Sequence, residues 1–108
     1  MNTELPPAIA AFFRAHNTGQ TDGFNDLFTR DALVSDEGHE YRGAAIKGWI
    51  DGAIAKYKPN AEATDLVQVG DKTIVTAQVS GPFPGSPIRI RYNFTLENGK
   101  IAALAIGT

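Results

Sequence analysis

The stretch Ile88-Arg-Ile-Arg-Tyr-Asn-Phe-Thr-Leu-Glu-Asn-Gly-Lys-Ile-Ala-Ala-Leu-Ala-Ile106 decides the fold of this chain. From Ile88 to Leu96 apolar and polar side chains alternate, which predicts a strand with one face on a core and the other towards water. Asn98-Gly99 follows, and this pair is the strongest short signal of a two-residue hairpin turn. A second strand, from Lys100 to Ile106, then completes an antiparallel hairpin.

The same alternation upstream predicts two further strands, Glu62–Val69 and Thr73–Gly81. Gly70-Asp71 closes this pair as a tight hairpin. The connection to the next strand, Gly81–Pro87, is longer and is stiffened by three prolines. The second half of the chain is therefore predicted to be a four-strand antiparallel meander.

Apolar residues in the first half recur at helical spacing and predict three helices. The first begins at Pro6-Pro7 and ends at Gly19, because proline suits a helix start and glycine a helix end. The second is short and follows a capping Thr21 or Asp22, and the third runs from about Ala44 to Tyr57. Their apolar faces contain Ile9, Phe12, Phe13 and His16; Phe24, Leu27 and Phe28; and Ile46, Trp49, Ile50, Ala53, Ile54 and Tyr57.

Two short strands, Ala32–Ser35 and His39–Arg42, are expected between the second and third helices, as a hairpin over Gly38. Helices gathered before a sheet indicate an α+β domain in which the helices cover one face. The length of 108 residues fits one domain, residues 1–108, with a single core.

Composition and charge exclude several classes of function. The net charge of −2 and the scattered lysines and arginines argue against a nucleic-acid partner or a membrane-binding patch. The absence of cysteine removes disulfides and thiolate metal sites, and two lone histidines make no metal motif. The chain starts without a secretion signal, and no apolar stretch approaches the thickness of a bilayer, so we expect a cytoplasmic protein.

Three polar side chains are predicted to point inwards: Asp36, Tyr92 and His16. Asp36 lies where the strand Ala32–Ser35 ends, in phase with the apolar Ala32 and Val34. Partial burial there would make its carboxylate a better base. Sparse polar groups in a mostly apolar cavity are typical of small-molecule sites.

Each of these residues also has a purely structural interpretation. Asp36 could be a turn residue that accepts backbone hydrogen bonds before Gly38. His16 could be a hydrogen-bonded histidine at a helix C-terminus, and Tyr92 a core tyrosine with a satisfied hydroxyl. Trp49 and Tyr57 fit core or pocket wall better than chemistry.

Four segments resemble the nuclear-transport-factor-2-like superfamily in its SnoaL-like and ketosteroid-isomerase-like branch: His16-Asn-Thr-Gly-Gln-Thr-Asp-Gly-Phe-Asn-Asp-Leu-Phe28, Phe28-Thr-Arg-Asp-Ala-Leu-Val-Ser-Asp36, Tyr41-Arg-Gly-Ala-Ala-Ile46 and the closing meander with Asn98-Gly99. The resemblance covers nearly the whole chain. It implies a cystatin-like α+β roll, in which a curved antiparallel sheet wraps around the three helices as a cone with an apolar pocket, and it implies a homodimer.

The resemblance also assigns roles residue by residue. Asp36 matches the aspartate that moves a proton between carbons next to a carbonyl in ketosteroid isomerases. In those enzymes a tyrosine and a protonated aspartic acid stabilise the enolate oxygen of the substrate. Phe12 stands at the tyrosine position and cannot donate a hydrogen bond, whereas Tyr92 stands at the late-strand position and can. His16 is a candidate substitute donor. The implied pocket wall consists of Phe12, Phe13, Val34, Trp49, Tyr57 and Phe94.

The expected function is therefore that of an isomerase, cyclase or dehydratase that abstracts a proton from a small apolar carbonyl compound, with no cofactor and no metal. Two alternatives stay open, because this fold hosts many functions. One is a binding module that uses the same pocket without catalysis. The other is a dimeric interaction module whose interior is filled by side chains.

Overall fold

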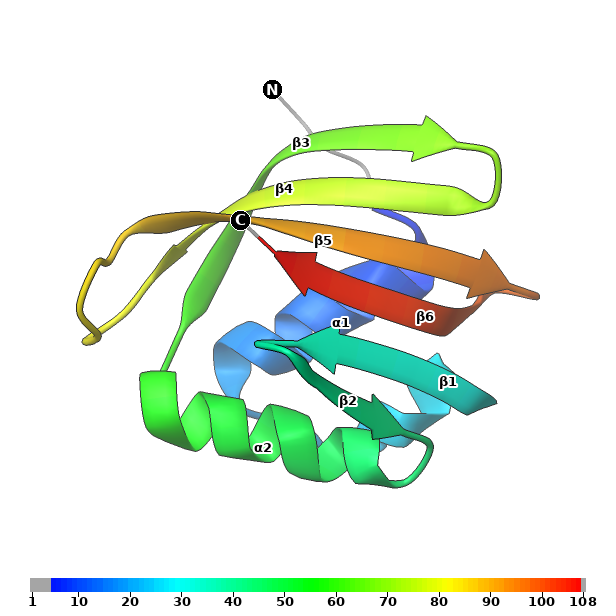
Figure 1. Ribbon diagram of the computed structural model, residues 1–108, viewed down its shortest axis with the longest axis horizontal. Coiled ribbons are helices and arrows are strands. Elements are labelled where there is room, and N and C mark those ends of the chain that lie inside the picture. The colour runs from blue at the N-terminus through cyan, green and yellow to red at the C-terminus, as the bar shows by residue number, and fades with distance from the viewer. Residues whose placement is uncertain (1–4, 108) are drawn as a thin grey trace.

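A computed structural model gives the structure of this protein and describes residues 5–107. Within these residues it contains two α-helices, one 3₁₀ turn and one six-stranded sheet (Figure 1). The fold is α+β, as predicted. The elements are α1 (Pro7–Thr18), η1 (Phe24–Leu27), β1 (Phe28–Asp36), β2 (His39–Arg42), α2 (Ala45–Tyr57), β3 (Asn60–Val69), β4 (Lys72–Ser80), β5 (Ile88–Glu97) and β6 (Lys100–Gly107).

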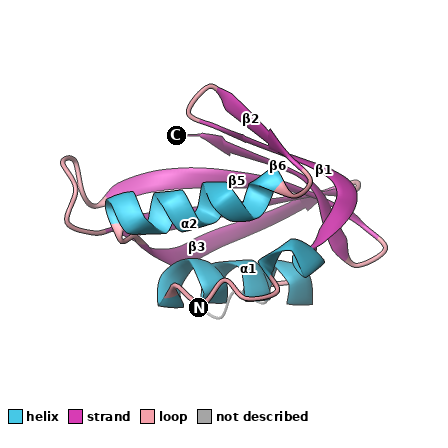
Figure 2. Cartoon of the chain, turned by 90° about the horizontal axis from the view of Figure 1, so that it is seen from below, coloured by secondary structure: helices cyan, strands magenta, loops and turns pink. Residues whose placement is uncertain are grey.

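The sheet has the strand order β2-β1-β6-β5-β4-β3. The last four strands form the antiparallel meander that the alternation predicted, within one or two residues of the expected bounds. β1 returns to this meander as a parallel neighbour of β6, and β2 forms a hairpin on its outer edge. The sheet is curved, and both helices lie against the same face of it (Figure 2).

The two-residue turns adopt backbone conformations that their residues favour. Asn98 and Gly99 both have positive φ, 53° and 79°, which is the pattern of the two-residue turns that match strand twist. Glu37 and Gly38 repeat this pattern between β1 and β2, with φ of 51° and 77°. The second hairpin places Asp36 at the last position of β1, opposite His39.

The prediction of three helices was wrong, because the second one is a single 3₁₀ turn. Gly23 adopts a left-handed conformation before it, so neither Thr21 nor Asp22 is its cap. Phe28 already belongs to β1, where it pairs with Ile101 of β6. Strand pairing therefore overrides the helical spacing of Phe24, Leu27 and Phe28. The Thr21 hydroxyl instead donates to Asp51, which ties this segment to α2.

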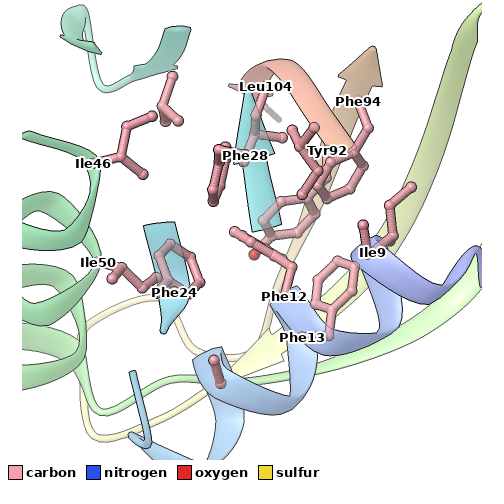
Figure 3. Packing of buried hydrophobic residues seen from close by; sticks show 14 of the residues in the cluster. Ile9, Phe12, Phe13, Phe24, Phe28, Ile46, Ile50, Tyr92, Phe94 and Leu104 are labelled. Carbon is pink, nitrogen blue, oxygen red and sulfur yellow. The ribbon is translucent and has the colours of Figure 1, made fainter. Parts of the chain in front are cut away.

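Phe12 is the centre of the core. Its ring is fully buried and meets Phe13 and Phe94 edge-on, at centroid distances of 5.1 and 5.3 Å. Phe24 of η1 adds a tilted contact at 5.6 Å. Figure 3 shows this cluster between the apolar side chains of α2 and those of the sheet. The space between α1, η1 and β5 is therefore closed by aromatic rings.

None of the helices within residues 5–107 is both long enough and apolar enough to cross a membrane.

Candidate functional site

A cavity of about 230 Å³ lies beside the aromatic cluster, between α2, the inner face of the sheet and the loop that joins β4 to β5. Apolar side chains make most of its wall. The residues that line it are His16, Asp36, Glu37, Trp49, Ile50, Ala53, Tyr57, Pro59, Val79, Phe83, Pro84, Ile88, Ile90, Tyr92 and Ile106.

Asp36 enters this cavity from the end of β1. Ala32 and Val34 on the same face are fully buried, so the strand directs the half-buried carboxylate inwards. The indole Nε1–H of Trp49 donates to Asp36 Oδ2 over 3.0 Å. Burial raises the pKa of Asp36, and the neighbouring Glu37 carboxylate adds to this, while the hydrogen bonds from Trp49 and the Glu37 backbone oppose it.

Tyr92 places a phenol at the same cavity, from the inner face of β5. Its residue is 3% exposed, and its hydroxyl has no hydrogen-bond partner among residues 5–107. Burial raises the pKa of Tyr92, and the negative charge of Asp36 raises it further. The hydroxyl therefore keeps its proton and is available to donate it in a hydrogen bond to a ligand.

His16 lines the cavity from the last turn of α1 and is 7% exposed. Its Nδ1 lies 2.9 Å from Asn17 Oδ1. Burial lowers the pKa of His16, and the hydrogen bond to Asn17 opposes that effect. The ring stands edge-on to Tyr92, with centroids 6.4 Å apart.

The rim of the cavity is held by Tyr57 at the end of α2. Its hydroxyl donates to Glu37 Oε1 over 3.1 Å, and its ring meets Phe83 of the β4–β5 loop edge-on at 5.8 Å. Gly81 permits this approach, because a Cβ there would lie 2.8 Å from the Tyr57 carbonyl oxygen and from the Phe83 ring. α2, the β1–β2 turn and the loop therefore meet at the mouth.

The three polar residues singled out in the sequence, Asp36, Tyr92 and His16, all reach this one cavity. Of the six residues expected to form its wall, only Trp49 and Tyr57 do so. The other four, Phe12, Phe13, Val34 and Phe94, are buried in the core and do not line it. The periodicity of a strand or helix identifies the residues that face the interior. It does not show which of them are packed in the core and which line a cavity.

Several wall residues were missed in the sequence. Ile88 and Ile90 have the same inward phase as Phe94 but lie further back along β5, and Ile106 ends β6. Phe83 is an aromatic residue between two prolines in a connection, and an apolar side chain in such a loop is a usable signal. Glu37 is an exposed turn residue next to Gly38, and no pattern in the sequence marks it as part of the lining.

The charges around the cavity have one sign. Its charged lining residues are Asp36 and Glu37, and none of its lining residues is a lysine or arginine. Among residues 5–107, no three histidine, aspartate or glutamate side chains gather as a metal site would require. The polar side chains of the lining can form hydrogen bonds and transfer protons within an apolar cavity.

Comparison with known proteins places this arrangement in a family. The model of the SnoaL-like domain matches residues 9–104. A Sinorhizobium meliloti protein of known structure, provisionally named a polyketide cyclase, is 39% identical, with 95% of each chain covered and a TM-score of 0.90. A search of curated proteins found no significant match.

More distant structures share the fold. A Catenulispora acidiphila protein with a ketosteroid-isomerase-like fold, solved with trimethylamine, is 18% identical, with 97% of this chain and 87% of that chain covered and a TM-score of 0.81. A cystatin-fold protein from Novosphingobium aromaticivorans is 20% identical over 99% of this chain and 100% of that chain, with a TM-score of 0.78. With a family model matched over most of its length and a relative at 39% identity, the chain belongs to the SnoaL-like domain family.

Proposed function

We propose that this protein is an enzyme that moves a proton on a small, largely apolar carbonyl compound, as an isomerase or cyclase does. The observation that carries the proposal is that Asp36 and Tyr92 line the same cavity. Asp36 is a carboxylate whose pKa is raised by burial, and the Tyr92 hydroxyl is a donor without a hydrogen-bond partner in residues 5–107. A base and a donor that face the same apolar space are what enolisation needs.

In the proposed reaction, Asp36 removes a proton from the carbon next to the carbonyl. The electron pair of that C–H bond forms the enolate, and negative charge moves to the carbonyl oxygen, where the Tyr92 hydroxyl stabilises it. The protonated Asp36 then returns the proton to a different carbon. Alternatively, the enolate attacks a second carbonyl of the same molecule, a C–C bond forms, and Asp36 gives its proton to the alkoxide that this leaves. Both routes leave the enzyme unchanged.

Trp49 has a positioning role in this proposal. Its indole N–H donates to Asp36 Oδ2 over 3.0 Å, so the carboxylate is held in a defined orientation at the cavity. The same hydrogen bond stabilises the ionised carboxylate and opposes the effect of burial on its pKa. The raised pKa makes the Asp36 carboxylate a stronger base than an exposed aspartate, and the hydrogen bond from Trp49 limits that increase.

The charges in the lining indicate the class of substrate. Asp36 and Glu37 would repel a carboxylate or a phosphate, and no lysine or arginine in the lining would offset that repulsion. The walls are isoleucine, valine, proline and aromatic side chains. A neutral ligand with a mainly hydrocarbon body and one or two oxygen atoms fits this environment best.

The test follows the exchange of the α-protons of an apolar ketone, β-tetralone, for deuterium by NMR. Asp36→Asn keeps the size of the side chain and its hydrogen bond from Trp49 but removes the base. We expect exchange to fall by about 100- to 10,000-fold. Asp31→Asn is the matched control, because Asp31 is an exposed aspartate on the same strand. Exchange by Asp36→Asn at the rate of the unsubstituted protein would exclude Asp36 as the base.

A second candidate function, ligand binding without catalysis, is favoured by Phe12. This fully buried residue occupies the position where the resembling isomerases have a donor tyrosine, so one of two oxyanion contacts is missing. If this alternative holds, the Asp36→Asn variant retains its affinity for β-tetralone. Neither the unsubstituted protein nor the variant then exchanges the α-protons of β-tetralone faster than buffer alone. Quenching of Trp49, the one tryptophan of the chain, reports binding directly.

We also propose that the protein forms a homodimer through the outer face of the sheet. Four residues form one row across four strands of this face: Val67, Ile74, Asn93 and Ala105. All four side chains are uncharged. Asn93→Arg would place a charge in the centre of that face in both copies. Sedimentation should then show a monomer, whereas Glu62→Arg at the exposed edge strand β3 should leave the dimer intact.

A further inference from the structure

The side chain of Asn17 is clamped onto the backbone of edge strand β3. Its Oδ1 accepts the N–H of Ala61 over 2.7 Å, and its Nδ2 donates to the Ala61 carbonyl over 2.9 Å. Backbone N–H groups only donate and carbonyl oxygens only accept, so a flipped amide would lose both bonds. The orientation of Asn17 is therefore fixed by Ala61.

This orientation determines the tautomer of His16. The atom of Asn17 that lies 2.9 Å from His16 Nδ1 is Oδ1, which has no proton to give. Nδ1 must therefore carry the proton and donate it. Burial lowers the pKa of His16 and favours the neutral ring, in which only one nitrogen is protonated. The other nitrogen, Nε2, then has a free lone pair.

The lone pair of Nε2 is accessible to solvent. No hydrogen bond to Nε2 is formed within residues 5–107, yet no fully buried polar side-chain atom there lacks a partner. Nε2 is thus reachable by solvent. His16 is 7% exposed and lines the cavity, so the cavity offers a ligand a route to this nitrogen.

We propose that His16 Nε2 is a specificity site that accepts a hydrogen bond from a hydroxyl group of the ligand, and that the substrate is therefore a hydroxy ketone or the enol of a dicarbonyl compound. The assignment of the carbonyl to Tyr92 rests on the proposed function. The two rings are perpendicular at 6.4 Å, so a donor and an acceptor a few bonds apart on one molecule can reach both. This reverses the role of hydrogen-bond donor that the sequence suggested for His16.

The tautomer of His16 also excludes this residue as the general acid of a dehydration. A dehydratase must protonate the hydroxyl that leaves as water, and an unprotonated Nε2 has no proton for it. A hydroxyl held by His16 is instead retained, with its own O–H bond intact. Isomerisation or cyclisation of an enolised substrate is compatible with this contact, whereas dehydration with His16 as the acid is not.

The first experiment measures the tautomer in the free protein. Long-range ¹H–¹⁵N correlation spectra of protein labelled at histidine distinguish a protonated from an unprotonated ring nitrogen. His39→Gln assigns the signals, because His39 is the other histidine and is exposed. We expect Nδ1 to be protonated and Nε2 to be unprotonated at neutral pH. A protonated Nε2, in either the other neutral tautomer or the cation, overturns the proposal without any ligand.

The second experiment compares three ketones of similar size by quenching of Trp49 fluorescence: α-hydroxyacetophenone, α-methoxyacetophenone and acetophenone. Only the first can donate to Nε2. We expect it to bind about tenfold more tightly than the methyl ether, the gain typical of one neutral hydrogen bond. His16→Phe keeps a ring of similar volume and should abolish this preference. Equal affinities in the unsubstituted protein, or no binding of any of the three, contradict the ligand assignment.

Failure of this inference and failure of the proposed catalysis give different results. If Asp36→Asn still exchanges β-tetralone protons while the hydroxyl preference depends on His16, the base assignment is wrong and the His16 site stands. If exchange depends on Asp36 but the three ketones bind equally, the catalysis stands and the His16 site is wrong.

Discussion

The two ends of β5 show how one strand serves both a core and a cavity. At its C-terminal end the inward side chain is Phe94, which is fully buried against Phe12. At its N-terminal end the inward side chains are Ile88 and Ile90, which are partly exposed and line the cavity. Tyr92 lies between them, with its ring at the core and its hydroxyl at the cavity. The difference comes from the aromatic rings of α1 and η1, which pack over one end and leave the other open.

The largest stability effect should come from the packed end. Phe12→Ala removes the fully buried ring at the centre of the aromatic cluster, and we expect it to lower the free energy of unfolding by about 3–5 kcal/mol. Ile90→Ala at the open end should lower it by less than about 2 kcal/mol, since its surroundings are already partly empty. Urea unfolding curves measure both. Equal losses would remove the distinction between the two ends.

The residue at the boundary should separate activity from stability. Tyr92→Phe keeps the ring but removes a hydroxyl with no hydrogen-bond partner in residues 5–107. We expect ketone exchange to fall by about 100- to 1,000-fold, as for the loss of one oxyanion donor. The free energy of unfolding should change by less than about 1 kcal/mol. A large loss of stability with unchanged exchange would make Tyr92 an ordinary core residue.

Protonation of His16, which lines the cavity, should make the stability of the protein depend on pH. The pKa of His16 is lowered in the folded state, so its contribution to stability is present above the unfolded value of 6.5 and is lost as the pH falls towards the folded value. The midpoint of thermal unfolding should therefore decrease between pH 7 and pH 5 more steeply in the unsubstituted protein than in His16→Gln. His39→Gln should retain the steeper decrease, because its ring is exposed.

The smallest effect on stability is expected from the carboxylate of Asp36. The pKa of Asp36 is raised on folding, so its stabilising contribution is present below the unfolded value of 3.8 and is lost as the pH rises through the folded value. At pH 7 the ionised side chain therefore destabilises the fold slightly. Asp36→Asn should raise the midpoint of thermal unfolding at pH 7, and the increase should vanish near pH 3. A decrease at pH 7 would mean that its contact with Trp49 outweighs burial.

Most of the sheet could be predicted from the sequence because strand alternation and turn chemistry are local. The four strands of the meander and the Asn98-Gly99 turn need only the residues that form them. The helix from Ala45 to Tyr57 was equally accessible. The second helix failed because four residues after Gly23 cannot sustain a helix when the next residue, Phe28, pairs with Ile101. That pairing joins residues far apart in the chain.

By itself, the sequence determined which side chains point inwards, because the periods of two and 3.6 residues assign each residue to a face. It determined Asp36, Tyr92 and His16 as the inward polar groups. Only the tertiary structure decided where along that interior the packing ends, and so placed Ile88 and Ile90 rather than Phe94 and Val34 on the cavity. The tertiary structure also decided which nitrogen of His16 carries the proton. The backbone of Ala61, 44 residues beyond Asn17, fixes the orientation of the Asn17 amide. The oxygen of that amide then requires a proton on His16 Nδ1 and leaves Nε2 for a ligand. Depth of packing and the direction of a hydrogen bond both depend on segments that meet only in the folded chain.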